Sequence, residues 1–456
     1  MGKRMAVILA AGKGTRMKSS LPKVLHSISG LSMVEHVIRA VKQSEVEELV
    51  TIIGNGAEQV QETLSDQTQF ALQTEQLGTG HAVQQAENLL SEFSGNTLVI
   101  CGDTPLLTGE TLHNLFKHHE ETNAIATILT AEAEDPTGYG RVIRDEQLSV
   151  QKIVEQKDAS PEELAVTEIN TGTYVFDNQA LFEALKKVGN ENAQGEYYLP
   201  DVIEIFKQQN ATVSAYIMSD IDEGLGVNDR VALAKAQRLM SERIVIQHMQ
   251  NGVKFTNPST VYIESDVTIG QDSLVEGGVH LKGETQIGAG CHIGSHTTII
   301  NSKIGDQVSI QQSVIEYSEV DQKVTIGPFA HLRPKSKLAE GVHIGNFVEV
   351  KNSYIGKNSK AGHLAYIGDA DVGQDVNISC GVIFCNYDGK RKYRSVIGDQ
   401  VFLGSNANII SPVEIGDRAF IAAGSTILKD VEEEALAISR SEQVNKMGYW
   451  SKFNNK

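Results

Sequence analysis

The sequence predicts an α/β domain, one long helix and an all-β domain, in that order, over residues 1–229, 230–250 and 251–456. Three observations lead to this prediction. Apolar, β-branched segments alternate with helical patterns through the first half of the chain. A helical pattern without an internal proline or glycine follows, and in the second half an aliphatic residue returns every six positions. With 456 residues, the chain is long enough for two or three domains.

The first half has the pattern of alternating strands and helices. Strand-like segments rich in Val, Ile and Leu include residues 5–10, 49–53, 97–103 and 124–129, and helical patterns include residues 34–43 and 82–90. Strand, helix and strand at this spacing favour a parallel sheet with helices on both faces. Because ligands of such sheets bind at the carboxyl ends of the strands, we expect a functional site there.

The connecting helix is expected between the two halves. Residues 229–252 contain no proline, and apolar residues recur in them at helical spacing. Their only glycine, Gly252, is the last residue, where glycine commonly ends a helix.

A six-residue period dominates the second half. Aliphatic residues recur at steps of six over residues 263–299, 326–350 and 397–427, with shorter runs over 355–367 and 372–378 where the frame slips. Glycine often follows the aliphatic residue. This period fits neither a helix nor ordinary strand alternation, and it is the hexapeptide signature of a parallel β-helix. The flat outer faces of such solenoids often serve for association.

Composition excludes several classes of partner. The net charge of −18 disfavours binding to nucleic acid or to an anionic membrane surface, so a phosphate ligand would need local clusters of Lys and Arg. The four cysteines are few, show no metal-binding spacing, and are typical of reduced thiols. The apolar segment near the N-terminus is too short for a signal peptide, and no long apolar run follows. We therefore expect a cytoplasmic protein without membrane insertion.

A glycine-rich loop ends the first predicted strand, within the sequence VILAAGKGTRMKSSLPK of residues 7–23. It is not a Walker loop, and Met17 stands where a dinucleotide fingerprint has its third glycine. Small residues bring backbone N–H groups close to an anion, and Lys13, Arg16 and Lys23 supply charge for triphosphate oxygens. The alternative is an ordinary tight turn with solvated cations. The loop and its Pro-Lys resemble the signature of the sugar-1-phosphate nucleotidylyltransferases, which implies nucleotide contacts at Leu9, Ala10, Ala11, Gly12, Arg16 and Lys23.

The same resemblance assigns further residues of the first half. QTEQLGTGHAV, residues 73–83, resembles the nucleotide-base loop of that family, with contacts at Gln73, Gly78 and Thr79. Asp103 and Asn228 resemble the family's Mg²⁺ contacts, and both are expected at the carboxyl ends of strands. Mg²⁺ held by one or two carboxylates plus substrate phosphates is the usual arrangement for this ion. The sugar contacts are expected at Gly140, Glu155 and Asn170, and Asn228 is also expected to contact the nucleotide sugar. Without the resemblance, Asp103 would be read as a loop cap before Pro105.

The two halves together resemble the bacterial bifunctional enzymes that combine N-acetylglucosamine-1-phosphate uridylyltransferase with glucosamine-1-phosphate N-acetyltransferase. The resemblance covers essentially the whole chain. It implies a Rossmann-like nucleotidylyltransferase domain, a long linker helix and a left-handed parallel β-helix of hexapeptide repeats. It also implies acetyl-CoA and UTP as co-substrates, Mg²⁺ at the uridylyltransferase site, a product used for cell-wall precursors, and a homotrimer formed through the β-helix.

A second site is expected on the β-helix. Arg333 and Lys351 each follow an inward-facing aliphatic residue, so both should face outward. They resemble the family's sugar-phosphate contacts, together with Tyr366 and Asn377. His363 resembles the catalytic base: an ammonium cannot attack a thioester, so a base must remove a proton, and imidazole titrates near neutral pH. A histidine at a solvent-facing corner is the alternative interpretation. The acetyl-CoA contacts are expected at Cys380, Asn386, Tyr387, Ser405, Ala423 and Arg440.

Two features bear on this second assignment. Residues 385–396, CNYDGKRKYRSV, interrupt the hexapeptide frame and predict a loop outside the coil, where function often lies. Cys380 stands where the family often has alanine, which leaves a backbone contact intact but puts a side-chain role in doubt. Two other functions compete. A single-activity sugar-nucleotide pyrophosphorylase whose β-helix only oligomerises is disfavoured by Arg333, Lys351, His363 and the inserted loop. A non-enzymatic regulatory subunit with the same domains should lack the working glycine loop, yet Lys23 and Asp103 are both present.

Overall fold

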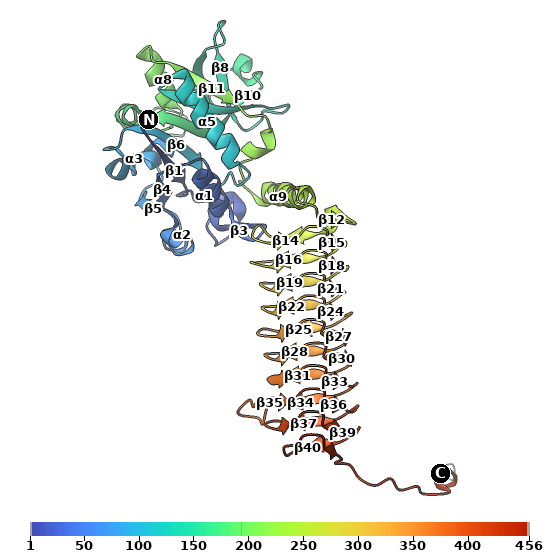
Figure 1. The fold of residues 1–456 in the computed structure, drawn as a ribbon. Helices are drawn as coiled ribbons and strands as arrows, with labels where there is room; N and C mark the ends of the chain where they lie inside the picture. Colours follow the sequence, from blue (N-terminus) through green and yellow to red (C-terminus); the bar gives the residue numbers. More distant parts are fainter. Residues whose placement is uncertain (1, 193, 454–456) are drawn as a thin grey trace. The chain divides into compact units, whose positions relative to one another are not determined.

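The computed structural model describes residues 2–192 and 194–453. The chain forms two compact units, Met1–Met240 and Ser241–Lys456 (Figure 1). The boundary between the units lies inside α9 (Arg230–Gln250), the long helix that the sequence pattern predicts. Asp229 begins this helix, because its Oδ1 accepts hydrogen bonds from the backbone N–H groups of Val231 and Ala232, both at 2.9 Å.

The first unit contains one mixed sheet. Its main path runs β11-β7-β10-β6-β1-β4-β5. These strands are β1 (Lys3–Leu9), β4 (Glu48–Ile53), β5 (Gln69–Leu72), β6 (Gly95–Cys101), β7 (Ala126–Glu132), β10 (Glu168–Asp177) and β11 (Val213–Ile217). The prediction of a parallel sheet holds for β1, β4, β5 and β6, and for β11 beside β7. It is wrong for β10, which lies antiparallel between β6 and β7.

A hairpin extends this sheet beyond β10. Strands β8 (Gly140–Arg144) and β9 (Val150–Val154) pair antiparallel with each other, and β8 also pairs with β10. The hairpin thereby brings residues around 140 and 155 beside Asn170 on β10. A smaller antiparallel pair, β2 (Ser27–Ile28) and β3 (Leu31–Ser32), lies near the N-terminus.

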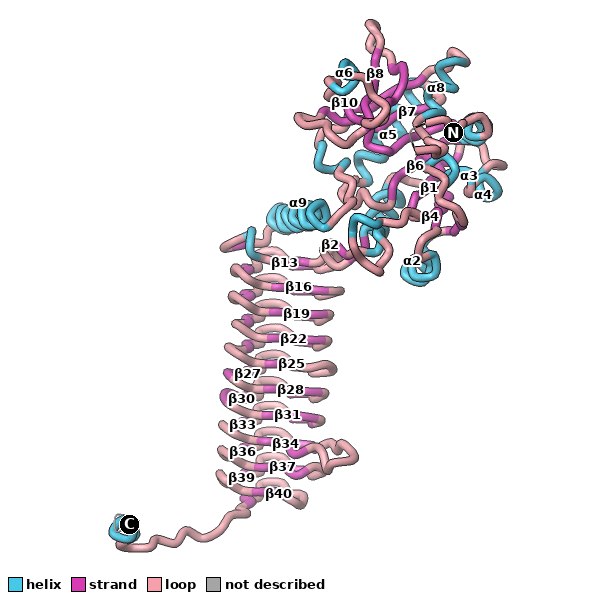
Figure 2. The backbone as a smooth tube through the Cα atoms, turned by 180° about the vertical axis from the view of Figure 1, so that it is seen from behind, coloured by secondary structure: helices cyan, strands magenta, loops and turns pink. Residues whose placement is uncertain are grey.

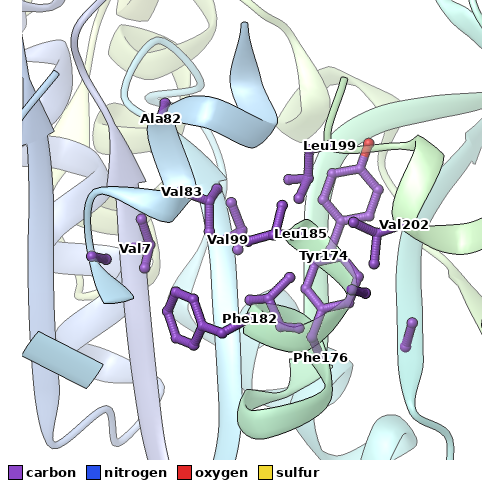
Figure 3. Packing of buried hydrophobic residues seen from close by; sticks show 14 of the residues in the cluster. Val7, Ala82, Val83, Val99, Tyr174, Phe176, Phe182, Leu185, Leu199 and Val202 are labelled. Atoms are coloured by element: carbon purple, nitrogen blue, oxygen red, sulfur yellow. The ribbon is translucent and has the colours of Figure 1, made fainter. Parts of the chain in front are cut away.

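Helices cover both faces of the sheet. One apolar cluster joins the sheet to α1 (Met33–Gln43), α2 (Ala57–Leu64) and α5 (Gly109–Thr122). The other joins it to α3 (Thr79–Gln84), α4 (Glu87–Leu90), α7 (Asn178–Leu185) and α8 (Asp201–Gln208). Figure 3 shows Val7 and Val99 of the sheet packed against Val83 and Phe182 in this second cluster. The single helix predicted over 82–90 is divided into α3 and α4, because the turn between them has tighter i→i−3 bonds such as Gln85 N–H to Ala82 O at 3.1 Å.

Short elements complete the first unit. They are α6 (Pro161–Leu164) and the 3-10 helices η1 (Thr15–Met17), η2 (Lys23–Leu25), η3 (Ser65–Gln67) and η4 (Ile221–Gly224). The second unit adds η5 (Pro258–Thr260) and α10 (Tyr449–Phe453). Among the residues described, no helix has the length and apolar character needed to cross a bilayer.

The second unit is a left-handed parallel β-helix with three sheets, which we call face 1, face 2 and face 3. Face 1 contains β12 (Lys254–Phe255), β15 (Leu274–Val275), β18 (His292–Ile293), β21 (Ser309–Ile310), β24 (Thr325–Ile326), β27 (His343–Asn346), β30 (Lys360–His363), β33 (Asn377–Ile378), β36 (Phe402–Leu403), β39 (Phe420–Ile421) and β41 (Leu436–Ala437). Face 2 contains β13 (Tyr262–Ile263), β16 (His280–Lys282), β19 (Thr298–Ile300), β22 (Val314–Glu316), β25 (His331–Leu332), β28 (Glu349–Lys351), β31 (Tyr366–Gly368), β34 (Ile383–Cys385), β37 (Asn408–Ile410) and β40 (Thr426–Ile427). Face 3 contains β14 (Thr268–Ile269), β17 (Gln286–Ile287), β20 (Lys303–Ile304), β23 (Glu319–Val320), β26 (Lys337–Leu338), β29 (Tyr354–Ile355), β32 (Ala370–Val372), β35 (Ser395–Ile397) and β38 (Glu414–Ile415).

The predicted hexapeptide frame corresponds to the buried axis of this β-helix. Every aliphatic residue in the predicted runs is buried, from Ile263 to Ile427. The slip after Ile299 is a change in coil length: the core continues through Ile304, Ile310 and other aliphatic residues, and the register pairs Ile299 with Ile315, only 16 residues later. A coil can thus lose two residues at its corners and keep its apolar interior.

One long loop leaves the coils. Residues 386–394 lie between β34 and β35 and project from the stack in Figure 2. The loop is fastened at its base, where Asn386 O accepts a hydrogen bond from Tyr393 N–H at 2.8 Å. The interruption of the frame at 385–396 therefore marks a true insertion.

Candidate functional sites

The first unit has a cavity of about 430 Å³ at the carboxyl edge of its parallel strands. Nine of the residues predicted from the sequence line it: Leu9, Ala10, Ala11, Gly12, Lys23, Gln73, Gly78, Thr79 and Asp103. Lys13 lines it as well. Sequence reasoning missed five further lining residues, which are Val24, Gln76, Ala82, Cys101 and Glu196.

The glycine loop shapes one side of this cavity. Gly14 has φ 57°, and a Cβ there would lie 2.6 Å from Lys23 Cβ, so a side chain at this position would push Lys23 away. At Gly12, by contrast, no atom of the described residues beyond its two chain neighbours lies within 4 Å of the place where a Cβ would be. The loop therefore leaves room for a ligand at Gly12 while packing tightly against Lys23.

Lys23 is the centre of a small polar cluster. Its ammonium forms an ion pair with Asp103 Oδ2 and donates to Asn228 Oδ1 at 3.2 Å. Arg16 Nη2 donates to the same Asn228 oxygen at 2.9 Å. The sequence predicted that Asn228 follows a strand, and this prediction is wrong. Asn228 lies between η4 and α9, where Val227 N–H donates to Asp103 O at 2.9 Å and brings the two segments together.

These side chains suit a hard divalent cation. Asp103 offers carboxylate oxygens and Asn228 an amide oxygen, close together at the cavity edge, and Mg²⁺ prefers oxygen ligands with its remaining positions filled by phosphates and water. Lys23 and Arg16 hold these oxygens in the structure. No group of three or more His, Cys, Asp or Glu side chains with metal-site geometry occurs within the described ranges. The arrangement therefore fits an ion that takes most of its ligands from substrate.

The base loop is fixed from outside its own sequence. Gly78 has φ 115°, and a Cβ there would lie 2.5 Å from Tyr197 O, so only glycine fits. Thr79 Oγ1 accepts from Leu199 N–H at 3.0 Å, and Gln73 Nε2 donates to Gly78 O at 3.2 Å. Glu196 thus lines the cavity while Tyr197 and Leu199 support the base loop, although this segment carries no motif that would have predicted either role.

The three predicted sugar contacts lie together beside β10. Gly140 pairs with Asn170 across the sheet, and Glu155 Oε1 lies 3.3 Å from the place of a Cβ at Gly140. Asn170 Nδ2 donates to the buried Tyr174 hydroxyl at 2.7 Å. Burial, with Asp158 and Asp201 nearby, raises the pKa of Glu155. These three residues do not line the cavity itself.

Cys101 lies between the cavity and β10. It lines the cavity, and its Sγ is 3.7 Å from the place of a Cβ at Gly172. Burial, reinforced by Asp103, raises the pKa of its thiol to about 12. Cys101 is therefore a neutral thiol, without the thiolate character that nucleophilic cysteines need.

In the second unit, Arg333 and Lys351 lie on adjacent coils of face 2. The register pairs Leu332 with Val350, so the two cations occupy equivalent positions one coil apart. Arg333 Nη1 contacts Glu349 Oε1 at 2.8 Å, and Lys351 Nζ contacts Asp369 Oδ2 at 3.2 Å.

Tyr366 and Asn386 lie in the same polar cluster as Lys351 and Asp369. Asn386 Nδ2 donates to Asp369 Oδ2 and to the Tyr366 hydroxyl. Burial opposes the charge on Asp369, but hydrogen bonds from Asn352, Lys351 and Asn386 outweigh it and lower the pKa of that carboxyl. Asp369 is therefore an anion that orients a lysine and two amides.

Lys392 is a cation of this group that sequence reasoning missed. The neighbouring Lys351 ammonium lowers the pKa of Lys392, and Arg333 adds to the effect. Three cations from two coils and the inserted loop thus meet at one place. The basic run KRKYR in the loop was a signal that could have identified it.

His363 belongs to a column along the corner between faces 1 and 2. The registers on face 1 align Ile344, Ala361, Ile378, Leu403 and Ile421 on successive coils. Two positions after each of these residues stands one member of the column, in order Asn346, His363, Cys380, Ser405 and Ala423. Arg440 Nη1 donates to Ala423 O at 2.8 Å and closes the column. Five of the predicted residues are thereby aligned; Asn377 lies on face 1 beside this column, and Tyr387 is exposed on the inserted loop.

The His363 ring has a defined orientation. Its Nδ1 lies 2.8 Å from Asn346 Oδ1. Because a carbonyl oxygen can only accept, Nδ1 carries the hydrogen and Nε2 keeps a free lone pair. His363 is exposed, so that lone pair is accessible from outside the coil.

Comparisons with known proteins identify the family of each half of the chain. Residues 5–225 match the nucleotidyl transferase family, and residues 266–301 and 394–429 match the bacterial transferase hexapeptide repeat. The chain is 58% identical to the bifunctional protein GlmU of Enterococcus faecalis over 99% of both chains. It is 59% identical to that of Streptococcus mutans, over 98% of this chain and 97% of the relative, and 56% identical to that of Halalkalibacterium halodurans over the full length of both. The chain belongs to the bifunctional GlmU family.

Membership in the GlmU family defines the general chemistry of each half. The protein is an enzyme with a nucleotidyltransferase half, which contains the cavity and the Lys23 cluster, and a hexapeptide acyltransferase half, which contains the cations and the His363 column. Each site has the chemistry that its half needs: cations and oxygen ligands for phosphates in the first, and an oriented imidazole in the second.

Proposed function

We propose that the protein carries out two consecutive transfers. The β-helix unit moves an acetyl group from acetyl-CoA to glucosamine-1-phosphate, and the first unit moves UMP from UTP to N-acetylglucosamine-1-phosphate. The products are UDP-N-acetylglucosamine, a cell-wall precursor, and pyrophosphate. The observation that carries this proposal is the presence of two separate sites, each with its own cations: Lys23 and Arg16 in one unit, and Arg333, Lys351 and Lys392 in the other.

In uridylyl transfer, a phosphate oxygen of the sugar phosphate attacks the α-phosphorus of UTP. One P–O bond forms, the bond to the β-phosphate breaks, and pyrophosphate leaves. Backbone N–H groups of residues 9–12 and the cations Lys13, Arg16 and Lys23 bind the triphosphate. Gln73, Gly78 and Thr79 hold the uracil base. Asp103 and Asn228 would bind Mg²⁺, which offsets phosphate charge when it is bound.

The sugar phosphate lies on the other side of the same site. Gly140, Glu155 and Asn170 bind the N-acetyl sugar, and Asn228 contacts the nucleotide sugar. Because these residues meet beside β10, next to Cys101 at the cavity edge, the bound sugar phosphate would point toward the triphosphate. Catalysis here is mainly positioning and charge stabilisation, as in other phosphoryl transfers.

In acetyl transfer, Nε2 of His363 removes a proton from the ammonium group of glucosamine-1-phosphate and leaves a neutral amine. The amine nitrogen then attacks the thioester carbonyl, the C–N bond forms, and the C–S bond breaks with release of CoA thiol. Arg333 and Lys351 bind the substrate phosphate, and Tyr366 and Asn377 contact the sugar. The CoA chain extends from His363 along the column at Cys380, Ser405 and Ala423 to Arg440, with Asn386 and Tyr387 at its side.

The same proposal includes a homotrimer formed through the β-helix. Hexapeptide repeats commonly associate, and an apolar column stands next to His363. Phe329, Phe347 and Leu364 are 52%, 55% and 58% exposed, and the two phenyl rings stack with centroids 5.4 Å apart. Such a column next to a catalytic residue suits a second copy that completes the site. A cytoplasmic location is also proposed, because the four free cysteines fit a reducing compartment.

Paired assays test the proposal. Wild-type protein should release CoA thiol from acetyl-CoA with glucosamine-1-phosphate, and pyrophosphate from UTP with N-acetylglucosamine-1-phosphate. Asp103→Ala should abolish pyrophosphate release and leave thiol release intact, and His363→Ala should do the reverse. A wild-type protein that released pyrophosphate but no thiol would instead support the single-activity pyrophosphorylase, which family membership does not favour.

A further inference from the structure

The β8–β9 hairpin has two faces with different chemistry. Along β8 and the end of β9, neighbouring residues point to opposite sides of the sheet. Gly140, Glu155 and Asn170 share one face, as their contacts show. Their chain neighbours Arg141 and Ile169 lie on the other face, and Gln156, in the turn after β9, bonds Arg141 there. Any force that holds Arg141 and Gln156 together therefore also fixes Gly140 against Glu155.

Arg141 is unusual among the arginines of this chain. It is 2% exposed, and it is among the largest fully buried side chains. Its guanidinium donates to Tyr139 O and, through Nη2, to Gln156 Oε1 at 3.0 Å. Its Nε has no hydrogen-bond partner among the residues that the structure describes. Both acceptors are neutral, and the nearest opposite charge is that of Asp135, whose pKa the guanidinium helps to lower without an ion pair to it among the described residues.

The neighbouring Arg144 shows the more usual arrangement. On the same strand, its guanidinium contacts both oxygens of Glu168, at 2.6 and 2.7 Å. A buried charge without a counter-ion costs stability, and so does a buried N–H without an acceptor. At Arg141 the only hydrogen-bond acceptors are neutral and Nε has none among the described residues, so the side chain is costly to bury, and this favours a role other than stabilising the fold.

Gln156 connects the two strands of the hairpin beyond the last residues that pair through their backbones. The paired residues of β8 and β9 stop at Arg141 and Val154, so Gly140 and Glu155 have no backbone pairing to each other. Gln156 Oε1 accepts from Gly138 N–H at 3.1 Å as well as from Arg141. One amide oxygen thus fastens the loop before Gly140 to the segment that carries Glu155. We call the contacts of Arg141 and Gly138 with Gln156 the hairpin clasp.

We propose that Arg141 is a positioning residue for the sugar-phosphate substrate: through the hairpin clasp it holds Gly140 and Glu155 at the spacing that receives the N-acetyl sugar. This inference rests on the proposed uridylyl transfer. It assigns to Arg141 and Gln156 no contact with UTP, because the nucleotide cavity is lined by other segments. Loss of the clasp should therefore weaken the sugar-phosphate step and leave nucleotide binding intact.

The test compares substitutions at both ends of the clasp in the full-length protein. Gln156→Leu removes the acceptor at nearly constant size, and Gln156→Glu keeps an acceptor and adds a counter-charge for Arg141. Gln156→Leu and Arg141→Met should raise the KM for N-acetylglucosamine-1-phosphate about 10-fold, with the KM for UTP within about 2-fold of wild type. Gln156→Glu should restore a KM close to wild type. Calorimetry should show weaker binding of UDP-N-acetylglucosamine but unchanged binding of UTP to the Leu and Met variants.

A control on the same hairpin separates this role from general damage. Gln151 Nε2 bonds Asp145 at the far end of the hairpin, at 2.5 Å, so Gln151→Leu makes the same change away from the clasp and should keep both KM values. Acetyl transfer by each variant reports that the protein is intact. If Arg141→Met does not fold, the comparison of Gln156→Leu with Gln156→Glu tests the inference. Unchanged sugar-phosphate KM in Gln156→Leu overturns the inference, as does an equal rise in the KM for UTP. A wild-type protein without uridylyl transfer overturns the proposed function instead.

Discussion

The contact between Asn346 and His363 determines which nitrogen of the proposed catalytic imidazole is available. Asn346 Oδ1 fixes the hydrogen on Nδ1, and the exposed Nε2 can then accept a proton from substrate. The hexapeptide frame is enough to predict that the two residues are neighbours, since Asn346 stands one coil before His363 at the equivalent position. The sequence interpretation named His363 and not Asn346, because a lone asparagine two positions after an aliphatic residue has no special signal.

Substitution of Asn346 should show how far this orientation matters. Asn346→Leu removes the acceptor, so both tautomers become available and kcat for acetyl transfer should fall about 10-fold. Asn346→Asp keeps the acceptor and places a carboxylate beside the ring, which raises the imidazole pKa and should move the acidic limb of the pH–rate profile to higher pH. Initial rates of CoA release over pH 5–9 measure both the fall in kcat and the shift of the acidic limb. An unchanged profile in Asn346→Asp would contradict the assignment of His363 as the base.

Two glycines of the nucleotide site should respond differently to the same change. At Gly12 an added methyl group meets no described atom and points into ligand space, so Gly12→Ala should keep the melting temperature and raise the KM for UTP about 10-fold or more. At Gly78 the same methyl would lie 2.5 Å from Tyr197 O at positive φ, so Gly78→Ala should lower the melting temperature of the first unit. Calorimetric melting and UTP kinetics separate the two outcomes, and the opposite pattern would contradict this reading of the loop.

At the scale of elements, helix α5 carries a pH-sensitive contact with the sheet. His119 is buried, and its Nδ1 lies 2.8 Å from Thr127 Oγ1 on β7. Burial lowers the pKa of His119 to about 4. In the unfolded chain His119 therefore binds a proton near pH 6.5, whereas in the folded unit it binds that proton only near pH 4.

This difference predicts an acid-labile first unit. The stabilisation that depends on neutral His119 is complete above pH 6.5, is lost as the pH falls toward 4, and changes no further below that. The loss is about 3 kcal/mol at most. His119→Gln should flatten this part of the curve, so the difference in unfolding free energy between wild type and variant, measured by urea titration at pH 7 and at pH 4.5, should shrink as the pH falls. A constant difference would show that His119 titrates normally.

The elements also show what periodicity can and cannot predict. The six-residue period located the axis of the β-helix to the residue, because each aliphatic side chain must be buried at every coil. It could not predict coils of 16 and 17 residues, since corners tolerate deletion without exposing the core. In the first unit, the buried strand β10 reads like its parallel neighbours, and its apolar pattern does not show that it runs antiparallel to β6, β7 and β8.

The candidate sites also contain some residues that the sequence could predict and others that it could not. Backbone-loop residues such as Gly12 and Gly78 were predictable, because their conformations require glycine within a recognisable motif. The contribution of Glu196, and of Cys101 beside Asp103, arises from tertiary packing between distant segments. Arg141 was invisible for another reason: its burial depends on the hairpin register, and arginine in a sequence is normally read as exposed.

At the scale of the whole molecule, the two units should be separable. The division lies between Met240 and Ser241, and the first half of α9 belongs to the first unit, where Gln237 Nε2 donates to Ser29 Oγ at 2.8 Å. A fragment of residues 1–240 should therefore fold and catalyse uridylyl transfer without acetyl transfer, and a fragment of residues 241–456 should show the reverse. Circular dichroism and the paired assays test both fragments. A folded 1–240 fragment without uridylyl transfer would mean that the first site needs the second unit.

The proposed trimer gives the last prediction, which links assembly to one activity only. Phe347 follows Asn346 and Leu364 follows His363, so a partner that covers the apolar column would also border the His363 imidazole, the proposed base. Phe347→Glu places a charge in that column and should dissociate the trimer to monomers, because burying an unpaired carboxylate costs more than the contact returns. Acetyl transfer should then fall more than 10-fold, while uridylyl transfer stays at the wild-type rate. Tyr354→Glu makes a matched change at an exposed aromatic residue on face 3 and should leave the trimer intact. Sedimentation velocity gives the assembly state of each variant. A Phe347→Glu protein that remained trimeric, or a monomer with full acetyl transfer, would show that the column does not join subunits at the catalytic site.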